Sequence, residues 1–119
     1  MSSFYIVDDD QDMIDMATTL LEAEGHLVSS NISAMFSISE ILSLKPDCVI
    51  VYFQMSAMDG MELCRELRKH TKLQKTKILM LSARTDVHWQ ETASAAGADS
   101  YLTKPINVET FVADVEQVL

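Results

Sequence analysis

The sequence is short of basic residues and long apolar runs, and each shortage excludes a class of function. Lys and Arg number 9 against 18 Asp and Glu, which gives a formal net charge of −9. A surface that binds nucleic acid needs a basic patch, and these scattered cations do not supply one. No apolar stretch is long enough to cross a bilayer, and residues 1–4 lack the basic segment of a secretory signal. We therefore expect a cytoplasmic protein that binds neither nucleic acid nor membrane.

Cysteine is also scarce, and the histidines are scattered. The two cysteines, Cys48 and Cys64, are not spaced as metal ligands or as a disulfide framework. Both lie in apolar patterns, so we expect reduced cysteines in the core. His26, His70 and His88 share no ligand spacing, which argues against a metal site built from them. A length of 119 residues is enough for one domain with a single core.

An unbroken apolar segment, 48–53, organises the rest of the chain. The turn pair Pro46-Asp47 precedes it, and a loop of small residues follows it. A short apolar run bounded by turns is typical of a strand buried on both faces, which occurs mainly in parallel sheets. Functional residues of such sheets lie at the carboxyl ends of the strands. Tyr52 therefore becomes a candidate functional residue.

Strand and helix patterns alternate five times along the chain. Strands are expected over 4–7, 26–30, 48–53, 77–81 and 100–103. Helices are expected over 12–24, 61–70, 85–96 and 108–118, with one more from a cap at Ser33 or Ser37 to just before Pro46. Asp12 is the expected N-cap of the first helix, and Gly25 can close it with a positive φ angle.

This alternation predicts an α/β fold with a doubly wound, five-stranded parallel sheet and helices on both faces. We choose the flavodoxin-like strand order 2-1-3-4-5. The carboxyl ends of strands 1, 3, 4 and 5 then converge. In that order they carry Asp8 and Asp9, Tyr52, Ser82 and Lys104.

The chain resembles the response-regulator receiver domain of two-component and phosphorelay signalling over nearly its whole length. The matching segments are Ile6-Val7-Asp8-Asp9-Asp10, Leu21-Glu22-Ala23-Glu24-Gly25-His26, Pro46-Asp47 with its strand, Met58-Asp59-Gly60-Met61-Glu62-Leu63, Leu81-Ser82-Ala83-Arg84, and Gly97-Ala98-Asp99-Ser100-Tyr101-Leu102-Thr103-Lys104-Pro105. Together, in this order and spacing, they are highly specific. We expect residues 1–119 to be one receiver domain, and the helical pattern still running at Leu119 is consistent with a further domain beyond it.

The resemblance implies a role for several of the strand ends. Asp8 and Asp9 would be the acidic pair that holds Mg²⁺ in the family, together with the backbone carbonyl of Gln54. Ser82 and Lys104 would contact the phosphoryl group.

Two positions near the fifth strand also match the family. Tyr101 would be the aromatic residue that changes rotamer with the signalling state. The peptide before Pro105 is usually cis in the family.

The central position departs from the family pattern. Tyr52 stands where the family has its phosphoacceptor Asp, whether one counts forward from Pro46 or back from Gly60. An aspartyl phosphate forms when an anionic carboxylate attacks a phosphorus neutralised by Mg²⁺, whereas a phenol, with a reference pKa of about 10, is neutral at pH 7. We predict that Tyr52 abolishes ordinary phosphorylation and weakens Mg²⁺ binding by removing one carboxylate ligand, so no cofactor is expected.

Without a strong metal site, the acidic pair needs another cation. Two adjacent carboxylates raise each other's pKa unless a cation intervenes. We expect Lys104 to bridge to Asp9 or Asp8, with the Tyr52 hydroxyl donating to the same cluster or to Ser82.

The leading hypothesis is a receiver that is not phosphorylated, is not an enzyme and serves as a protein-interaction module. Its expected partner face comprises 85–96, 100–103 and 108–118, which is the usual interaction face of the family. The partner could be a second copy, an attached effector domain or a kinase domain. Trp89 could belong to this face, or could simply pack against its own domain.

Two alternatives remain open at this stage. The domain could be a working receiver that uses Asp9, Asp10 or Asp59 as acceptor, or one in which Tyr52 was introduced by design. The run Asp8-Asp9-Asp10 also fits the start of Mg²⁺-dependent phosphatases of the haloacid-dehalogenase type. This chain is short for them and lacks an obvious second acidic pair.

Two further groups have simpler interpretations. The methionines within 55–61 are expected to fill loop and core space. Arg65, Arg68 and Lys69 are expected to form a solvated helix face.

Overall fold

The computed structural model describes all residues, 1–119, and is built on one parallel sheet. Its strands run in the order β2-β1-β3-β4-β5, and every neighbouring pair is parallel. Their bounds are Ser3–Val7 for β1, Leu27–Asn31 for β2, Cys48–Tyr52 for β3, Lys77–Ser82 for β4 and Ser100–Thr103 for β5. The predicted fold class and strand order are confirmed.

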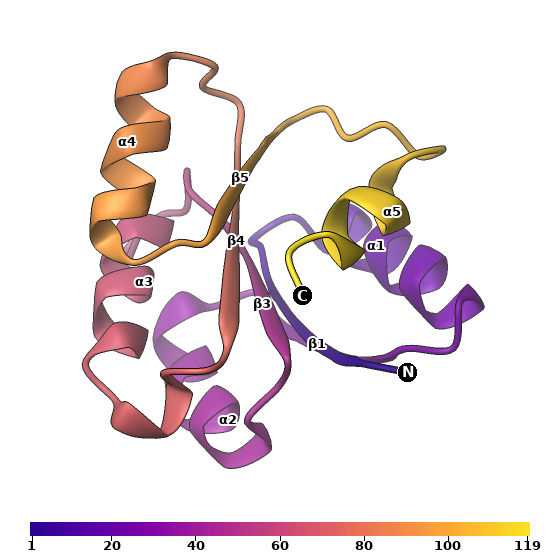
Figure 1. Cartoon of the computed structure of the whole chain (residues 1–119), viewed down its shortest axis with the longest axis horizontal. Helices are drawn as coiled ribbons and strands as arrows, with labels where there is room; N and C mark the ends of the chain where they lie inside the picture. The colour runs from indigo at the N-terminus through magenta and orange to yellow at the C-terminus, as the bar shows by residue number, and fades with distance from the viewer.

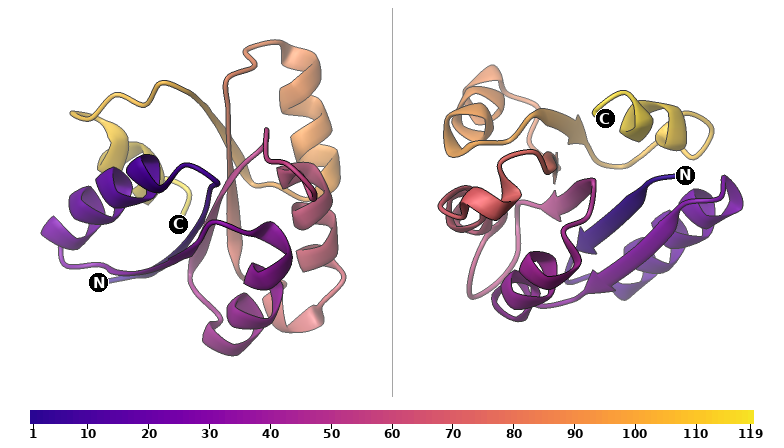
Figure 2. Two further views of the ribbon diagram at one scale, coloured as in Figure 1. Left: turned by 180° about the vertical axis from the view of Figure 1, so that it is seen from behind. Right: turned by 60° about the horizontal axis from the view of Figure 1, so that its bottom comes forward.

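Helices cover both faces of this sheet. They are α1 (Gln11–Ala23), α2 (Ala34–Leu44), α3 (Gly60–Arg68), α4 (Val87–Ala96) and α5 (Phe111–Glu116), with a short 3₁₀ turn at Thr71–Leu73. Figure 1 shows α1 and α5 on one side of the sheet and α2, α3 and α4 on the other, and the rear view in Figure 2 agrees. None of these helices combines the length and apolar character required to cross a membrane.

The core consists of two apolar clusters separated by the sheet. Alternate residues of β3 face opposite sides, with Val49 and Val51 toward α2, α3 and α4, and Cys48 and Ile50 toward α1 and α5. Both cysteines are free and buried, as predicted. Burial is the main cause that raises the pKa of Cys48 to about 12 and that of Cys64 to about 11.

The predicted N-cap of the first helix, Asp12, was wrong by two residues. Asp10, not Asp12, is the N-cap of α1, because its carboxylate accepts from the backbone N–H groups of Asp12 at 3.0 Å and Met13 at 3.4 Å. Because residues 8–12 contain four acids, the sequence does not show which one lies at the helix boundary.

Of the two serines predicted as possible caps of α2, Ser33 is the N-cap. Ser33 accepts from the backbone N–H of Phe36 at 3.3 Å. Ser37 is buried inside the helix, and its hydroxyl donates back to the Ser33 carbonyl at 2.6 Å.

The last helix is shorter than its apolar pattern predicted. A turn around Asn107 precedes it, in which the Asn107 side chain accepts from the N–H of Glu109 at 3.0 Å. Side-chain bonds of this kind compete with helical ones, and α5 begins only at Phe111.

The basic face of α3 is only partly solvated, so that prediction was wrong for Arg68. Arg65 and Lys69 are exposed, but the Arg68 guanidinium donates to the Gly97 carbonyl at 2.9 Å. It also donates to the Leu73 carbonyl at 3.0 Å and to the Asp99 carboxylate at 2.7 Å. Arg68 thereby ties the end of α3 to the loop between α4 and β5.

The start of α3 lies directly against the end of β3. The Gly60 N–H donates to the Phe53 carbonyl at 3.0 Å. A Cβ atom at Gly60 would lie 2.6 Å from the Tyr52 carbonyl oxygen and 2.8 Å from the Phe53 Cα. Glycine is required here because two backbones approach closely next to Tyr52.

Candidate functional site

The ends of four parallel strands meet at one edge of the sheet, as the strand order predicted. They bring together Asp8 after β1, Tyr52 at the end of β3, Ser82 at the end of β4 and Lys104 after β5. The Lys104 N–H donates to the Ser82 carbonyl at 2.8 Å, which fixes the end of β5 against β4. These four side chains form what we call the strand-end cluster.

An ion pair between Asp8 and Lys104 lies at the centre of the strand-end cluster. The Lys104 Nζ donates to the Asp8 Oδ2 at 2.8 Å, and the Asp8 Oδ1 accepts from the Asp10 N–H at 3.0 Å. Lys104 therefore bridges to Asp8, which decides between the two acids left open above. Asp9 is exposed.

The ionisation of Asp8 reflects competing effects. Burial raises the pKa of the Asp8 carboxyl above its usual range, because the charged form loses solvation. The Lys104 ammonium and the Asp10 N–H act in the opposite direction, and the net shift is upward. Burying the charged Asp8 carboxylate therefore costs more free energy than its two donors return.

The ring of Tyr52 is the second partner of Lys104. The Lys104 Nζ lies 3.5 Å from the centroid of this ring, within the range of a cation–π interaction. Tyr52 is half-buried and also packs against the core between the sheet and the α1/α5 layer. One ammonium is thus shared between a carboxylate and an aromatic face.

The Tyr52 hydroxyl makes neither of the predicted hydrogen bonds, to the acidic cluster or to Ser82, and Ser82 has other donors. The Ser82 Oγ accepts from the Gln54 Nε2 and from the Arg84 N–H, both at 3.0 Å. The Gln54 side-chain oxygen in turn accepts from the Ala83 N–H at 3.4 Å. Sequence reasoning had considered only the backbone carbonyl of Gln54, although an amide two residues past a strand end is within reach of the next strand.

Tyr101 and Trp89 are linked through Arg84, in the loop after β4. The Tyr101 hydroxyl donates to the Arg84 carbonyl at 2.6 Å. The Arg84 guanidinium lies 4.6 Å from the Trp89 ring centroid, and this ring lies 5.2 Å from that of Phe53. Trp89 is partly buried against the core, in agreement with the packing interpretation. The Lys104–Pro105 peptide is cis, as the resemblance implied.

The residues of the strand-end cluster do not fit the Mg²⁺ site that the resemblance implied. Mg²⁺ requires near-octahedral oxygen ligands, but both Asp8 oxygens already accept N–H donors, one of them an ammonium. The Lys104 ammonium lies 2.8 Å from the Asp8 carboxylate and would repel a second cation bound there. Tyr52 contributes a ring rather than an anionic oxygen. No group of three or more His, Cys, Asp or Glu side chains is arranged to hold a metal ion.

Comparison with known proteins identifies one protein family over most of the chain. The family model described as the response regulator receiver domain matches residues 4–116. The transcriptional regulator RpaA of Synechocystis, described as DNA-binding, is 29% identical over 119 residues, which are all of this chain and 49% of RpaA. The response regulator ArlR of Staphylococcus aureus is 26% identical over the same length, which is 53% of ArlR. This chain thus spans about half the length of both relatives.

Solved structures agree with the sequence relatives. The chemotaxis protein CheY4 of Vibrio cholerae superposes with a TM-score of 0.94 at 27% identity, covering 100% of this chain and 99% of CheY4. A putative response regulator of Chloroflexus aurantiacus has a TM-score of 0.91 at 30% identity, covering 98% of this chain and 96% of that one. With the strand order and the strand-end residues described above, these matches establish that the chain belongs to the response regulator receiver domain family.

Proposed function

We propose that this receiver does not accept a phosphoryl group at residue 52 and acts as a protein-interaction module, without catalytic turnover, in a signalling protein of the cytoplasm. The observation that supports the proposal is the position of the Lys104 ammonium. It lies 2.8 Å from the Asp8 carboxylate and 3.5 Å from the centre of the Tyr52 ring. In the family, a lysine after the fifth strand pairs with the phosphoryl group, and here that lysine is already occupied.

The chemistry of residue 52 supports the same proposal. A neutral phenol is a poor nucleophile toward phosphorus unless a base or a metal activates it. Neither Asp8 nor Ser82 is a free base for the Tyr52 hydroxyl, because Asp8 is paired with Lys104 and Ser82 already accepts from Gln54. The bulk of the ring also fills space beside Lys104 that a carboxylate would leave open.

The alternative acceptor acids are used structurally or make no ion pair with Lys104. Asp10 caps α1, and Asp59 caps α3 by accepting from the Glu62 N–H at 2.9 Å. Asp9 is exposed, and its neighbour Asp8 holds the lysine. This arrangement does not favour Asp9, Asp10 or Asp59 as a replacement acceptor.

The partner and the remainder of the protein are also proposals. RpaA and ArlR are about twice as long as this chain, which is consistent with a receiver joined to an effector or kinase domain. We propose that the face formed by α4, β5 and α5 contacts such a domain, or a second copy. The cluster of Tyr101, Arg84 and Trp89 would hold the loop next to that face in one arrangement.

Intact-mass spectrometry after incubation with acetyl phosphate and Mg²⁺ tests the proposal. We expect no adduct on the native chain. The Tyr52→Asp variant is the matched control, and we expect it to gain one phosphoryl group that hydroxylamine removes. The new carboxylate would supply the missing nucleophile and metal ligand beside Asp8 and Asp9, and would compete with Asp8 for Lys104. A stoichiometric adduct on the native chain would contradict the proposal, and mapping its position would separate Tyr52 from Asp9, Asp10 and Asp59.

A further inference from the structure

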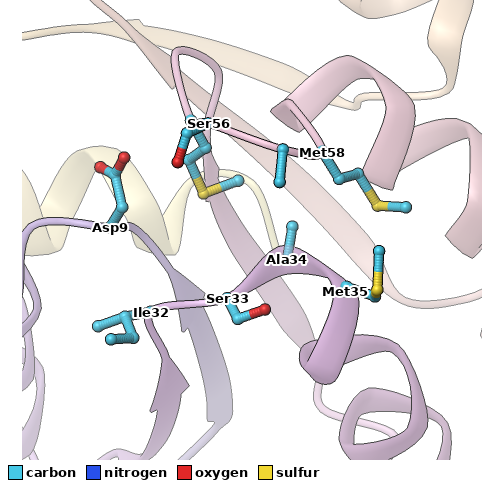
Figure 3. Close-up of a pocket in the computed structure, with 9 residues that line it drawn as sticks. Asp9, Ile32, Ser33, Ala34, Met35, Ser56 and Met58 are labelled. Atoms are coloured by element: carbon cyan, nitrogen blue, oxygen red, sulfur yellow. The ribbon is translucent and has the colours of Figure 1, made fainter.

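A small pocket lined mainly by apolar residues lies beside the strand-end cluster, between the segments that follow β1, β2 and β3. Its walls include Ile32, Met35, Met55 and Met58, with Asp9 on one side, and we call it the methionine pocket. Figure 3 shows lining residues from three segments: Asp9 after β1, residues 32–35 at the start of α2, and Ser56 and Met58 after β3. Its volume is about 140 Å³, close to the roughly 150 Å³ cavity that holds benzene. It can therefore accept one aliphatic or aromatic side chain.

The surface next to the methionine pocket is apolar and exposed. Ile32, Met35 and Phe36 are 55%, 61% and 72% exposed. Exposed apolar groups that adjoin one another mark interaction sites more often than single ones do. Methionine adapts to different partner shapes because its side chain is unbranched and polarisable.

Helix α2 also carries little charge. Glu40 is the only charged residue within α2, and its carboxylate accepts from the Tyr5 hydroxyl and, at 3.4 Å, from the Asn31 amide. These bonds lower the pKa of Glu40 and direct its charge toward the sheet. Apart from Glu40, which is itself exposed, the helix has only uncharged side chains on a chain in which 23% of the residues are charged.

Asp9 provides the one charge of the methionine pocket. It is exposed, and the lysine that could have neutralised it is paired with Asp8 instead. In Figure 3 the Asp9 carboxylate extends at the edge of the pocket, on the side of Ser56. An apolar hollow with a carboxylate at its edge complements an apolar side chain followed by a cation.

We infer that the methionine pocket docks a basic amphipathic helix of a partner protein, with one apolar side chain in the pocket and a Lys or Arg on Asp9. Residues three or four positions apart on a helix are neighbours, so one helix can present both groups. The net charge of −9 would steer a basic partner toward the domain. It also disfavours a second copy, which would bring the same negative charge against Asp9. This inference rests on the proposed function and gives the interaction module a second surface, apart from the face of α4, β5 and α5, with a stated partner chemistry.

The test uses two synthetic peptides as probes, one of Leu and Lys at amphipathic helical spacing and one with every Lys replaced by Glu. Binding is measured by fluorescence anisotropy, and the site is located from amide chemical shifts in NMR spectra. We expect the Lys peptide to shift amides of Ile32, Met35, Ser56 and Met58, and the Glu peptide to bind at least about tenfold more weakly. Met35→Gln and Asp9→Asn should each lower the affinity for the Lys peptide by about tenfold, as expected when a central contact is removed.

Matched variants separate this site from general attraction to an acidic protein. Val87 is 64% exposed on α4, and Asp86 is exposed and makes no side-chain cap bond. Val87→Gln and Asp86→Asn should leave the affinity within about twofold.

Several results would overturn the inference. The first is an equal loss of affinity for the Lys peptide in the control variants, or no binding of this peptide at all. The second is amide chemical-shift changes confined to α4, β5 and α5. The third is a dimer of the domain in sedimentation that Met35→Gln abolishes. Because no phosphoryl donor or Mg²⁺ is present, failure here leaves the mass-spectrometric test of the proposed function unaffected, and the reverse also holds.

Discussion

Lys104 and Asp8 are 96 residues apart in the sequence and 2.8 Å apart in space. Their ion pair joins the carboxyl end of β5 to that of β1, on either side of the central strands. The side chain of Asp8 is 1% exposed and that of Lys104 is 18% exposed. Losing one partner of such a buried pair costs more than the pair itself contributes, because the other charge is left without solvent or counter-ion.

Lys104→Ala should therefore destabilise the domain at pH 7 by about 3 kcal/mol. The loss should shrink as the pH is lowered, because an unpaired Asp8 can then take up a proton. Urea denaturation at several pH values measures both effects. Lys72, which is exposed, gives the control Lys72→Ala, expected to be neutral within about 0.5 kcal/mol. Equal stability of the Lys104→Ala and Lys72→Ala proteins would show that the ion pair does not matter.

Asp8→Asn should change how stability depends on pH. Because burial raises the pKa of Asp8 in the native state, the folded protein holds this proton more tightly than the unfolded chain. The stability that Asp8 contributes is then fully present below its pKa in the unfolded chain, near 3.8. It is lost as the pH rises through the higher pKa of the native state. The stability of Asp8→Asn relative to the native protein should thus increase from pH 4 to pH 7. A difference that does not vary with pH would mean that the pKa is not raised.

Two substitutions at Tyr52 distinguish its ring from its hydroxyl. Lys104 contacts the ring face, so Tyr52→Phe should change the free energy of unfolding by less than about 0.5 kcal/mol. Tyr52→Leu removes the aromatic face and should lose about 1 kcal/mol of cation–π energy. Thermal and urea denaturation of both proteins measure the contrast. A larger loss in Tyr52→Phe than in Tyr52→Leu would assign the role to the hydroxyl.

Arg68→Ala should be much more harmful than Arg65→Ala, although both arginines lie on α3. Arg68 donates to Leu73, Gly97 and Asp99, and their loss should cost about 2 to 3 kcal/mol. Arg65 is exposed, and its removal should cost less than about 0.5 kcal/mol. Denaturant titration of the two variants is the measurement, and similar losses would disprove the anchoring role of Arg68.

Gly60→Ala should destabilise the domain by about 2 kcal/mol, since the new methyl group would overlap the backbone at the end of β3. The chemical shifts of Tyr52 and Phe53 should move with it. Gly25, where a Cβ would meet nothing within 4 Å but φ is +86°, provides a contrast, because Gly25→Ala is strained only through its backbone. Unchanged stability and unchanged shifts in Gly60→Ala would show that α3 can move away from β3 freely.

The order of elements and the composition of the strand-end cluster could be predicted from the sequence. Both depend on periodic patterns and on turn residues, which are local properties of the chain. The apolar run before Tyr52 predicted a central strand, and the strand order then brought Asp8, Ser82 and Lys104 to the same edge. The choice between Asp8 and Asp9 as the partner of Lys104 could not be made, because both acids follow β1 directly.

Other features depend on side-chain rotamers across elements that are distant in sequence. Nothing in the pattern around Arg68 distinguishes it from Arg65, since its three acceptors come from other loops. The contact of Lys104 with the ring of Tyr52 likewise requires the three-dimensional positions of two strand ends. The sequence predicts that the methionines of the loop after β3 only fill space, and the fold shows that Met55 and Met58 line one pocket with Met35.

The burial of both thiols has a practical consequence for spectroscopy. With pKa values of about 12 and 11, Cys48 and Cys64 supply almost no thiolate at neutral pH, and thiolate is the species that alkylating reagents attack. A single cysteine introduced on the outer surface, for example by Ser39→Cys on α2, would therefore be labelled selectively by maleimide dyes. Dye-based distance measurements on this domain need no prior removal of its native sulfhydryl groups.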